Sequence, residues 1–77
     1  MKINLSITGP VKKPGGQSEI DIYIDGKKKI KDILLEHGYK EEELEFIMCF
    51  LNNKPVAMDT EVKDKDKICL TLLVGGG

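Results

Sequence analysis

The sequence has few tryptophans, cysteines and histidines and no surplus of positive charge. Its 77 residues include no tryptophan, two cysteines and one histidine. The sequence has 12 lysine and arginine residues and 13 acidic residues, which gives a net charge of −1. Because a phosphate backbone is bound by surplus positive charge, this balance argues against nucleic acid as a main ligand.

Long apolar runs are also missing. No stretch approaches the roughly 20 apolar residues that a membrane-spanning helix needs, and MKINLSIT at the start is too polar and too regularly alternating for a signal peptide. We therefore expect a cytoplasmic protein without a membrane partner. An apolar content of 40% with 32% charged residues is typical of a folded domain, and 77 residues suffice for one.

The scarce reactive residues do not form a catalytic pattern. Cys49 and Cys69 lie in apolar stretches and are expected to be reduced core residues. His37 has no metal-ligand spacing around it and is expected to end a helix. The glycine-rich segment GPVKKPGG lacks the Gly-Lys-Ser/Thr ending of a phosphate loop. We expect a protein that is not an enzyme, with no metal site and no bound cofactor.

The first half of the chain predicts a hairpin and a helix. Apolar and polar residues alternate over 3–8 and 19–25, which indicates two antiparallel strands joined by a turn-rich loop. Helical spacing of apolar residues then predicts a helix over 27–37, which places three lysines in its first turn. Asp25 is the expected N-cap and Gly38 the left-handed C-cap residue.

The second half predicts three more strands. The expected elements are a charged connector that can form a helical turn (40–45), a strand (46–51), a turn (52–54), a short edge strand (56–58), a charged turn (63–67) and a last strand (68–74). One helix covers one face of such a sheet, and crossover handedness places the first and last strands parallel in the middle. This is an α+β, β-grasp arrangement: a mixed sheet of four to five strands with one main helix. We expect a domain over 1–74 and a flexible tail over 75–77.

Strand 46–51 is apolar on both faces, although the helix covers only one face. The side chains expected on the uncovered face are Phe46, Met48, Phe50, Cys69, Thr71 and Leu73, with Tyr23 beside them. Exposed apolar surface of this kind marks a partner site, and methionine and aromatic residues are favoured there. The alternative is that the loop 9–17 or the connector 40–45 folds over this surface.

The sequence closes in LTLLVGGG, residues 70–77. Glycine has no Cβ, so this tail can enter a narrow slot, and three residues reach about 10 Å. A carboxylate reacts poorly as an electrophile, but condensation with ATP to an acyl adenylate exposes it to a sulfur or nitrogen nucleophile. That machinery would belong to a partner. The alternative is a glycine end without a function.

The stretch FLNNKPVAMDTEVKDKDKICLTLLVGGG, residues 50–77, resembles the ubiquitin-like sulfur carriers, the family of the molybdopterin-synthase small subunit MoaD and the thiazole carrier ThiS. The residues that match the family's pattern are Asn52, Asp64, Asp66, Ile68, Val74, Gly76 and Gly77. The order of the first strand and the helix agrees as well. Lys65 stands where the family usually has a turn glycine. Leu72 and Leu73 stand where molybdopterin carriers commonly have two prolines, and Thr71 where an aromatic is common.

This resemblance implies that an E1-like enzyme of the MoeB or ThiF type adenylates Gly77 with ATP, and that a sulfur donor converts it to a thiocarboxylate. The sulfur would pass to a molybdopterin-synthase large subunit or a thiazole synthase. The residues implied or expected to contact partners are Gly76, Gly75, Val74, Leu73, Thr71, Phe50 and Met48. Two alternatives remain: a ubiquitin-like modifier conjugated through Gly77, and a β-grasp binding module that never reacts. The receiving pathway stays open among molybdopterin, its tungsten relative, thiazole and transfer RNA thiolation.

Overall fold

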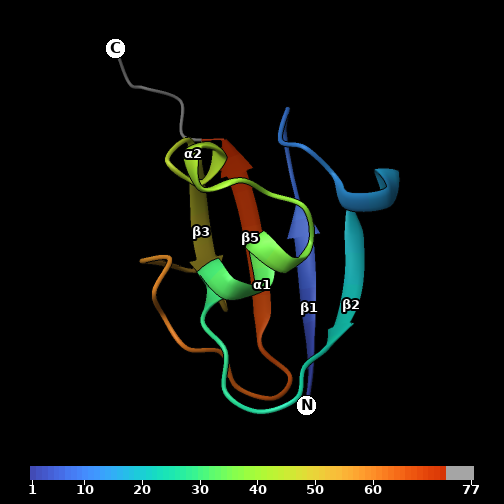
Figure 1. The fold of residues 1–77 in the computed structure, drawn as a ribbon, viewed down its shortest axis with the longest axis vertical. Coiled ribbons are helices and arrows are strands. Elements are labelled where there is room, and N and C mark those ends of the chain that lie inside the picture. The colour runs from blue at the N-terminus through green and yellow to red at the C-terminus, as the bar shows by residue number, and fades with distance from the viewer. Residues whose placement is uncertain (73–77) are drawn as a thin grey trace.

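A computed structural model describes residues 1–72 and shows one sheet with both helices on the same face (Figure 1). The elements are β1 (Lys2–Ile7), the 3-10 turn η1 (Pro14–Gly16), β2 (Glu19–Tyr23), α1 (Ile30–Glu36), α2 (Glu41–Leu44), β3 (Ile47–Leu51), β4 (Lys54–Val56) and β5 (Lys67–Leu72). The five strands follow the order β2-β1-β5-β3-β4. Strands β1 and β5 are parallel at the centre and the other neighbours are antiparallel. The predicted β-grasp order is confirmed.

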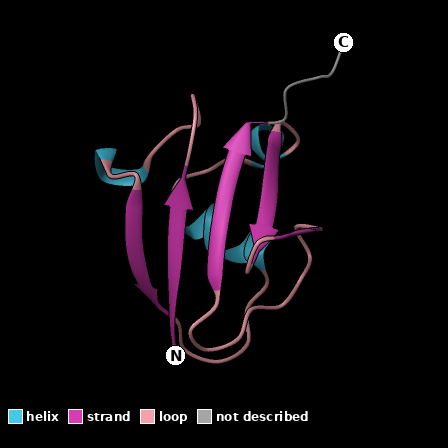
Figure 2. Ribbon diagram, turned by 180° about the vertical axis from the view of Figure 1, so that it is seen from behind, coloured by secondary structure: helices cyan, strands magenta, loops and turns pink. Residues whose placement is uncertain are grey.

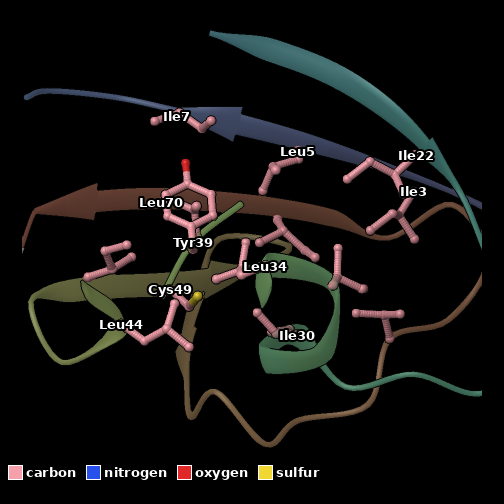
Figure 3. Close-up of a cluster of buried hydrophobic side chains, with 14 of the residues drawn as sticks. Ile3, Leu5, Ile7, Ile22, Ile30, Leu34, Tyr39, Leu44, Cys49 and Leu70 are labelled. Carbon is pink, nitrogen blue, oxygen red and sulfur yellow. The ribbon is translucent and has the colours of Figure 1, made fainter. Parts of the chain in front are cut away.

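The hydrophobic core lies between the sheet and α1 (Figure 3). The side chains that are less than 2% exposed are Ile3, Leu5, Ile30, Ile33, Leu34, Ile68 and Leu70. Each such side chain contributes about 1.5–3 kcal/mol by leaving water. The predicted alternation of β1 and β5 therefore places their apolar residues under the helix. Within the described chain, no helix has the length and apolar character to cross a membrane.

The predicted start of the helix was wrong. Helix α1 begins at Ile30, and Lys29 occupies the N-cap position, where its backbone N–H donates to Asp32 Oδ2 at 3.2 Å. Asp25 is therefore not the cap, and the lysines at 27–29 precede the helix instead of filling its first turn. The backbone N–H of Ile30 donates to the carbonyl of Thr60 at 3.0 Å. A distant segment thus satisfies a helix-end amide that local residues were expected to cap.

The end of α1 agrees with the prediction. His37 is the C-cap residue, and its Nδ1 lies 2.9 Å from the carbonyl oxygen of Ile33. Gly38 follows with a φ of +99°, a left-handed conformation that glycine adopts without a Cβ clash. The connector after it contains α2, as expected for 40–45.

Most of the predicted strand boundaries shifted: those of β1 and the starts of β3 and β5 by one residue, and the end of β2 and both ends of β4 by two. Asn52 and Asn53 both have positive φ, +50° and +71°, and form a two-residue hairpin turn. Pairing therefore resumes at Lys54, opposite Leu51, and β4 occupies 54–56 in place of 56–58. Strand β2 ends at Tyr23, two residues before the predicted end at 25. The last strand is described to Leu72.

Asn52 and Asp66 hold the turn that leads into β5. The Asn52 side-chain amide donates to Asp66 Oδ1 at 3.0 Å, and its Oδ1 accepts from the backbone N–H of Lys67 at 3.0 Å. The other Asp66 oxygen accepts from the backbone N–H of Lys63 at 2.7 Å. These bonds give the family-like spacing of Asn52 and Asp66 a structural reason, since they fix the path of the chain into the central strand.

Lys65 adopts the left-handed conformation, with a φ of +71°, at the position where the resembled family has glycine. Its backbone N–H donates to the carbonyl of Lys2 at 2.7 Å. The backbone N–H of Lys2 in turn donates to Asp64 Oδ1 at 2.8 Å. The turn keeps its conformation despite the side chain because these two bonds tie it to β1.

Candidate functional site

The helices leave one face of the sheet open (Figure 2). The alternation of burial along β3 and β5 and the pairing of these strands bring the predicted partner-binding residues Met48, Phe50 and Thr71 together on that face. Strand pairing sets Met48 beside Thr71 and Phe50 beside Cys69. Met48 is 38% exposed, and the other three side chains are half-buried. The four residues form a compact, largely apolar group, which we call the open-face patch.

The segments that were expected as alternative covers pack on the opposite face. Val11 in the first loop is buried in the core, and the Tyr39 hydroxyl donates to the carbonyl of Lys12. Leu44 of α2 is also a core residue. Because these anchors join the core on the α1 side, neither segment covers the open-face patch.

The open face changes character across the sheet. Next to the patch, β1 and β2 present polar residues, and the Asn4 amide donates to Asp21 Oδ1 at 3.2 Å. Lys2 Nζ lies 3.8 Å from Asp21 Oδ2, and both side chains are about half exposed. A partner that lies across the whole face therefore meets apolar groups over β3 and β5, and charged groups over β1 and β2.

A second apolar feature lies where β5 approaches its end. Phe46 is 61% exposed, and it borders a hollow of about 380 Å³ that Tyr39, Ile47 and Leu72 also line. Lys12 Nζ stands 3.6 Å from a Glu43 carboxylate oxygen at the rim. Sequence reasoning missed this hollow because it did not assign Tyr39 to the core. The apolar side chain directly after the helix-ending glycine was the available signal.

Cys49 and Cys69 are not bonded to each other, as expected, but only Cys49 is a core residue. Both thiols are free, Cys49 in the core and Cys69 on the open face. Burial, with a smaller contribution from Cys69, raises the pKa of the Cys49 thiol to about 12. Cys49 therefore stays protonated at neutral pH and is unsuited to nucleophilic chemistry. Among residues 1–72 no three histidine, cysteine or acidic side chains gather as potential metal ligands.

The five C-terminal predicted site residues are Leu73, Val74, Gly75, Gly76 and Gly77. They lie outside the described residues, so their roles remain predictions, as does the predicted boundary between domain and tail. The described chain does locate their point of attachment. Leu72 pairs with Ile47 at the end of the central strand β5, beside α2 (Figure 1).

Comparison with known proteins confirms the fold. No protein-family model and no curated protein matches the sequence. Among solved structures, SAMP1 from Haloferax volcanii matches over 100% of both chains with a TM-score of 0.75 and 15% identity. A putative molybdopterin converting factor subunit 1 from Pyrococcus furiosus matches with a TM-score of 0.75 and 18% identity, over 95% of this chain and 98% of that one.

A third structure is the complex of subunits 1 and 2 of the molybdopterin-converting factor from Helicobacter pylori. One of its chains matches over 100% of both lengths, with a TM-score of 0.66 and 26% identity. These neighbours are β-grasp, ubiquitin-like carrier or modifier proteins. The resemblance inferred from residues 50–77 is therefore confirmed by structures that match along the whole chain.

Proposed function

We propose that this protein is a sulfur carrier that works through the carboxylate of Gly77. The observation that carries the proposal is the position of β5, the last described strand, in the sheet. Strand β5 is central in the sheet, its start is held by Asn52 and Asp66, and it contributes Cys69 and Thr71 to the open-face patch. In the sequence, three glycines follow this strand after Leu73 and Val74. A strand that carries part of an exposed apolar patch is suited to docking on a partner, and glycines that follow it in the sequence are slender enough to enter another protein's active site.

The chemistry follows from the weakness of a carboxylate as an electrophile. A Gly77 carboxylate oxygen attacks the α-phosphorus of ATP and pyrophosphate leaves, which forms an acyl adenylate. A hydrosulfide-level sulfur nucleophile then attacks the acyl carbon and AMP leaves, so the glycine ends in a thiocarboxylate. In this scheme the partner binds ATP and the sulfur donor, so the reaction requires no cofactor or metal on this chain.

Two partners follow from this sequence of steps. An E1-like adenylating enzyme of the MoeB or ThiF type charges Gly77, and a synthase accepts the sulfur. The complex of molybdopterin-converting factor subunits from Helicobacter pylori supports an acceptor of the molybdopterin type, and thiazole synthase is the alternative. In this proposal the chain is a substrate of these enzymes and is not itself an enzyme. We place the reaction in the cytoplasm, where ATP is available.

A ubiquitin-like modifier is the second candidate function. It is favoured by the likeness to two crystal structures from Haloferax volcanii, one described as SAMP1 and one as small archaeal modifier protein 1. The second matches with a TM-score of 0.73 and 13% identity. In that case a lysine amine, in place of sulfur, displaces AMP from Gly77 and an isopeptide bond forms. A binding module that never reacts is the third candidate, and it uses the open-face patch alone.

Intact mass spectrometry separates these functions. The protein is incubated with ATP, a MoeB- or ThiF-type enzyme and a sulfide donor. A carrier gains the mass difference of one sulfur for one oxygen at Gly77, whereas a modifier gives larger conjugates on denaturing gels when lysine-bearing proteins are added. An unchanged mass and no conjugates under these conditions would leave only the binding module.

Phe50→Asp tests the open-face patch. A charge in this half-buried apolar position is expected to weaken docking on the adenylating enzyme by at least about tenfold, because desolvating a carboxylate against an apolar surface is costly. The titration is followed by fluorescence anisotropy. Tyr23→Asp, on the same face but outside the patch, is the matched control and should dock within about twofold. Equal binding by Phe50→Asp would place the interface elsewhere, and its unfolding would place Phe50 in the core.

A further inference from the structure

The two edges of the sheet differ in their readiness to accept another strand. Strand β4 is three residues long and carries Pro55, opposite Phe50. Prolines and short length are the usual means of blocking an edge. Strand β2 is five residues long, EIDIY, and contains neither proline nor lysine. Apart from η1 near its first residue, no other described segment lies beyond β2 in Figures 1 and 2.

The pairing of β2 with β1 shows which backbone groups remain free at this edge. The backbone N–H of Ile24 donates to the carbonyl of Met1 at 2.7 Å, and the carbonyl of Ile24 accepts from the amino group of Met1 at 2.8 Å. In an antiparallel pair such inward-facing residues alternate with outward-facing ones. The N–H and C=O groups of Glu19, Asp21 and Tyr23 therefore point outward. Each of these three residues can form a pair of backbone hydrogen bonds with an incoming antiparallel strand.

The side chains at the edge define what an added strand must carry. Glu19, Asp21 and Tyr23 all lie on the open face and are exposed, and Tyr23 is 78% exposed. Residues 17–26 contain three acidic residues and no basic one. On the other face, Ile20 is half-buried and packs against the core. Opposite-charge pairs across neighbouring strands are stabilising, and Tyr is a frequent anchor at interfaces.

We propose that the β2 edge binds an extended segment of a partner protein in which lysine or arginine alternates with apolar residues, and that this segment adds antiparallel as a sixth strand. Its basic side chains lie beside Glu19 and Asp21, and its apolar side chains extend the core next to Ile20. This is strand addition, in which backbone bonds supply affinity and alternate side chains supply specificity. The site is separate from the tail and does not rest on the proposed sulfur transfer.

A second copy of the chain fits this edge poorly. An antiparallel β2–β2 pair centred on Asp21 sets that carboxylate opposite its own copy. If one strand slides by two residues relative to the other, Glu19 lies opposite Asp21 in one direction and opposite Asp25 in the other. Like charges directly opposite each other destabilise strand pairs. The charge of the edge therefore favours a basic partner over self-association.

The test uses the full 77-residue protein, labelled with ¹⁵N, and an acetylated, amidated heptapeptide in which lysine alternates with valine. Titration is expected to shift the amide signals of Glu19, Asp21 and Tyr23 and to slow their hydrogen exchange. The amides of β4 are expected to stay unchanged. A heptapeptide with glutamate in place of lysine has the same apolar residues and is expected not to bind.

Two N-methylated peptides test the backbone bonds without changing the protein. In the antiparallel arrangement the lysine N–H groups point at β2 and the valine N–H groups point away. Methylation of the lysine nitrogens is expected to abolish binding, and methylation of the valine nitrogens to preserve it. The variant with Glu19→Lys and Asp21→Lys is expected to bind the original peptide about tenfold or more weakly. Its matched control, with Glu42→Lys and Glu45→Lys, makes the same charge change near α2 and should bind as the parent does.

Three results would overturn the proposal. Shifts centred on Met48 and Phe50 would mean that the peptide lies on the open face. Retained binding by the lysine-methylated peptide would mean that the edge amides and carbonyls take no part. Concentration-dependent shifts of the β2 amides without any peptide would mean that a second copy occupies the edge. Failure of thiocarboxylate formation would leave this proposal untouched, because no residue after Leu72 takes part.

Discussion

Removal of Gly76 and Gly77 is expected to abolish thiocarboxylate formation and to change the free energy of unfolding by less than about 0.5 kcal/mol. The truncated chain ends in the carboxylate of Gly75, about 7 Å short of the reacting position, whereas the core side chains run from Ile3 to Leu70. Sulfur incorporation is measured by intact mass after incubation with ATP, the adenylating enzyme and a sulfide donor. The unfolding free energy is measured by urea titration.

The matched control for this truncation is Gly77→Ala. It keeps the terminal carboxylate at position 77 and adds one methyl group. Reaction is expected to slow without disappearing, because the length of the tail is unchanged and only its slenderness is reduced. A truncated chain that still acquires sulfur would show that the reaction does not need the carboxylate of Gly77. A truncated chain that unfolds would show that the last glycines belong to the folded domain.

Leu70→Ala is expected to cost about 2–5 kcal/mol of the free energy of unfolding, the largest stability effect that we predict. Leu70 is fully buried in β5, where it pairs with Ile7 on one side and Cys49 on the other. Total stabilities of about 5–15 kcal/mol are usual for small domains, so this loss leaves the protein marginal at 25 °C. Urea denaturation followed by circular dichroism measures the change.

Thr71→Ala is the control for Leu70→Ala. It alters the next residue of the same strand, whose half-buried side chain lies on the open face, and is expected to cost less than about 1 kcal/mol. Similar losses for the two variants would contradict the assignment of the core to the α1 side of β5.

The sheet could be predicted from the sequence because a strand's side chains alternate strictly between two faces. Ile3, Leu5 and Ile7 are all buried as their spacing indicates. The doubly apolar strand at 46–51 was informative for the same reason. With one helix available, Met48 and Phe50 had to remain outside the main core, and the structure places them on the open face.

The start of the helix could not be predicted, because its end groups are bonded to residues far along the chain. The backbone N–H of Val62 donates to the carbonyl of Lys28 at 3.1 Å, which keeps this segment extended before α1. The backbone N–H of Lys31 reaches the carbonyl of Met58 at 2.8 Å. Local capping preferences take no account of contacts with distant residues. They therefore predict Asp25 as the N-cap, whereas the N-cap is Lys29.

The candidate site also has parts that the sequence predicts and parts that depend on contacts between distant segments. Met48, Phe50 and Thr71 could be grouped from strand alternation, and pairing across β3 and β5 brings them together. The position of Tyr39 directly after the helix-ending glycine was a signal for a core residue, but the hollow that it lines with Leu72 also depends on how the first loop folds. The predicted roles of residues 73–77 are based on composition and on the family resemblance alone. The truncation of Gly76 and Gly77 and the intact-mass measurement test them.

The most direct test of the sulfur-carrier proposal is the intact mass of the protein isolated from its native source, with fragmentation of its C-terminal peptide. We predict a chain that ends at Gly77, with part of the population carrying sulfur in place of one carboxylate oxygen. A mature chain that continues past Gly77 would contradict the account, because the acyl carbon of that glycine would then be held in an ordinary peptide bond.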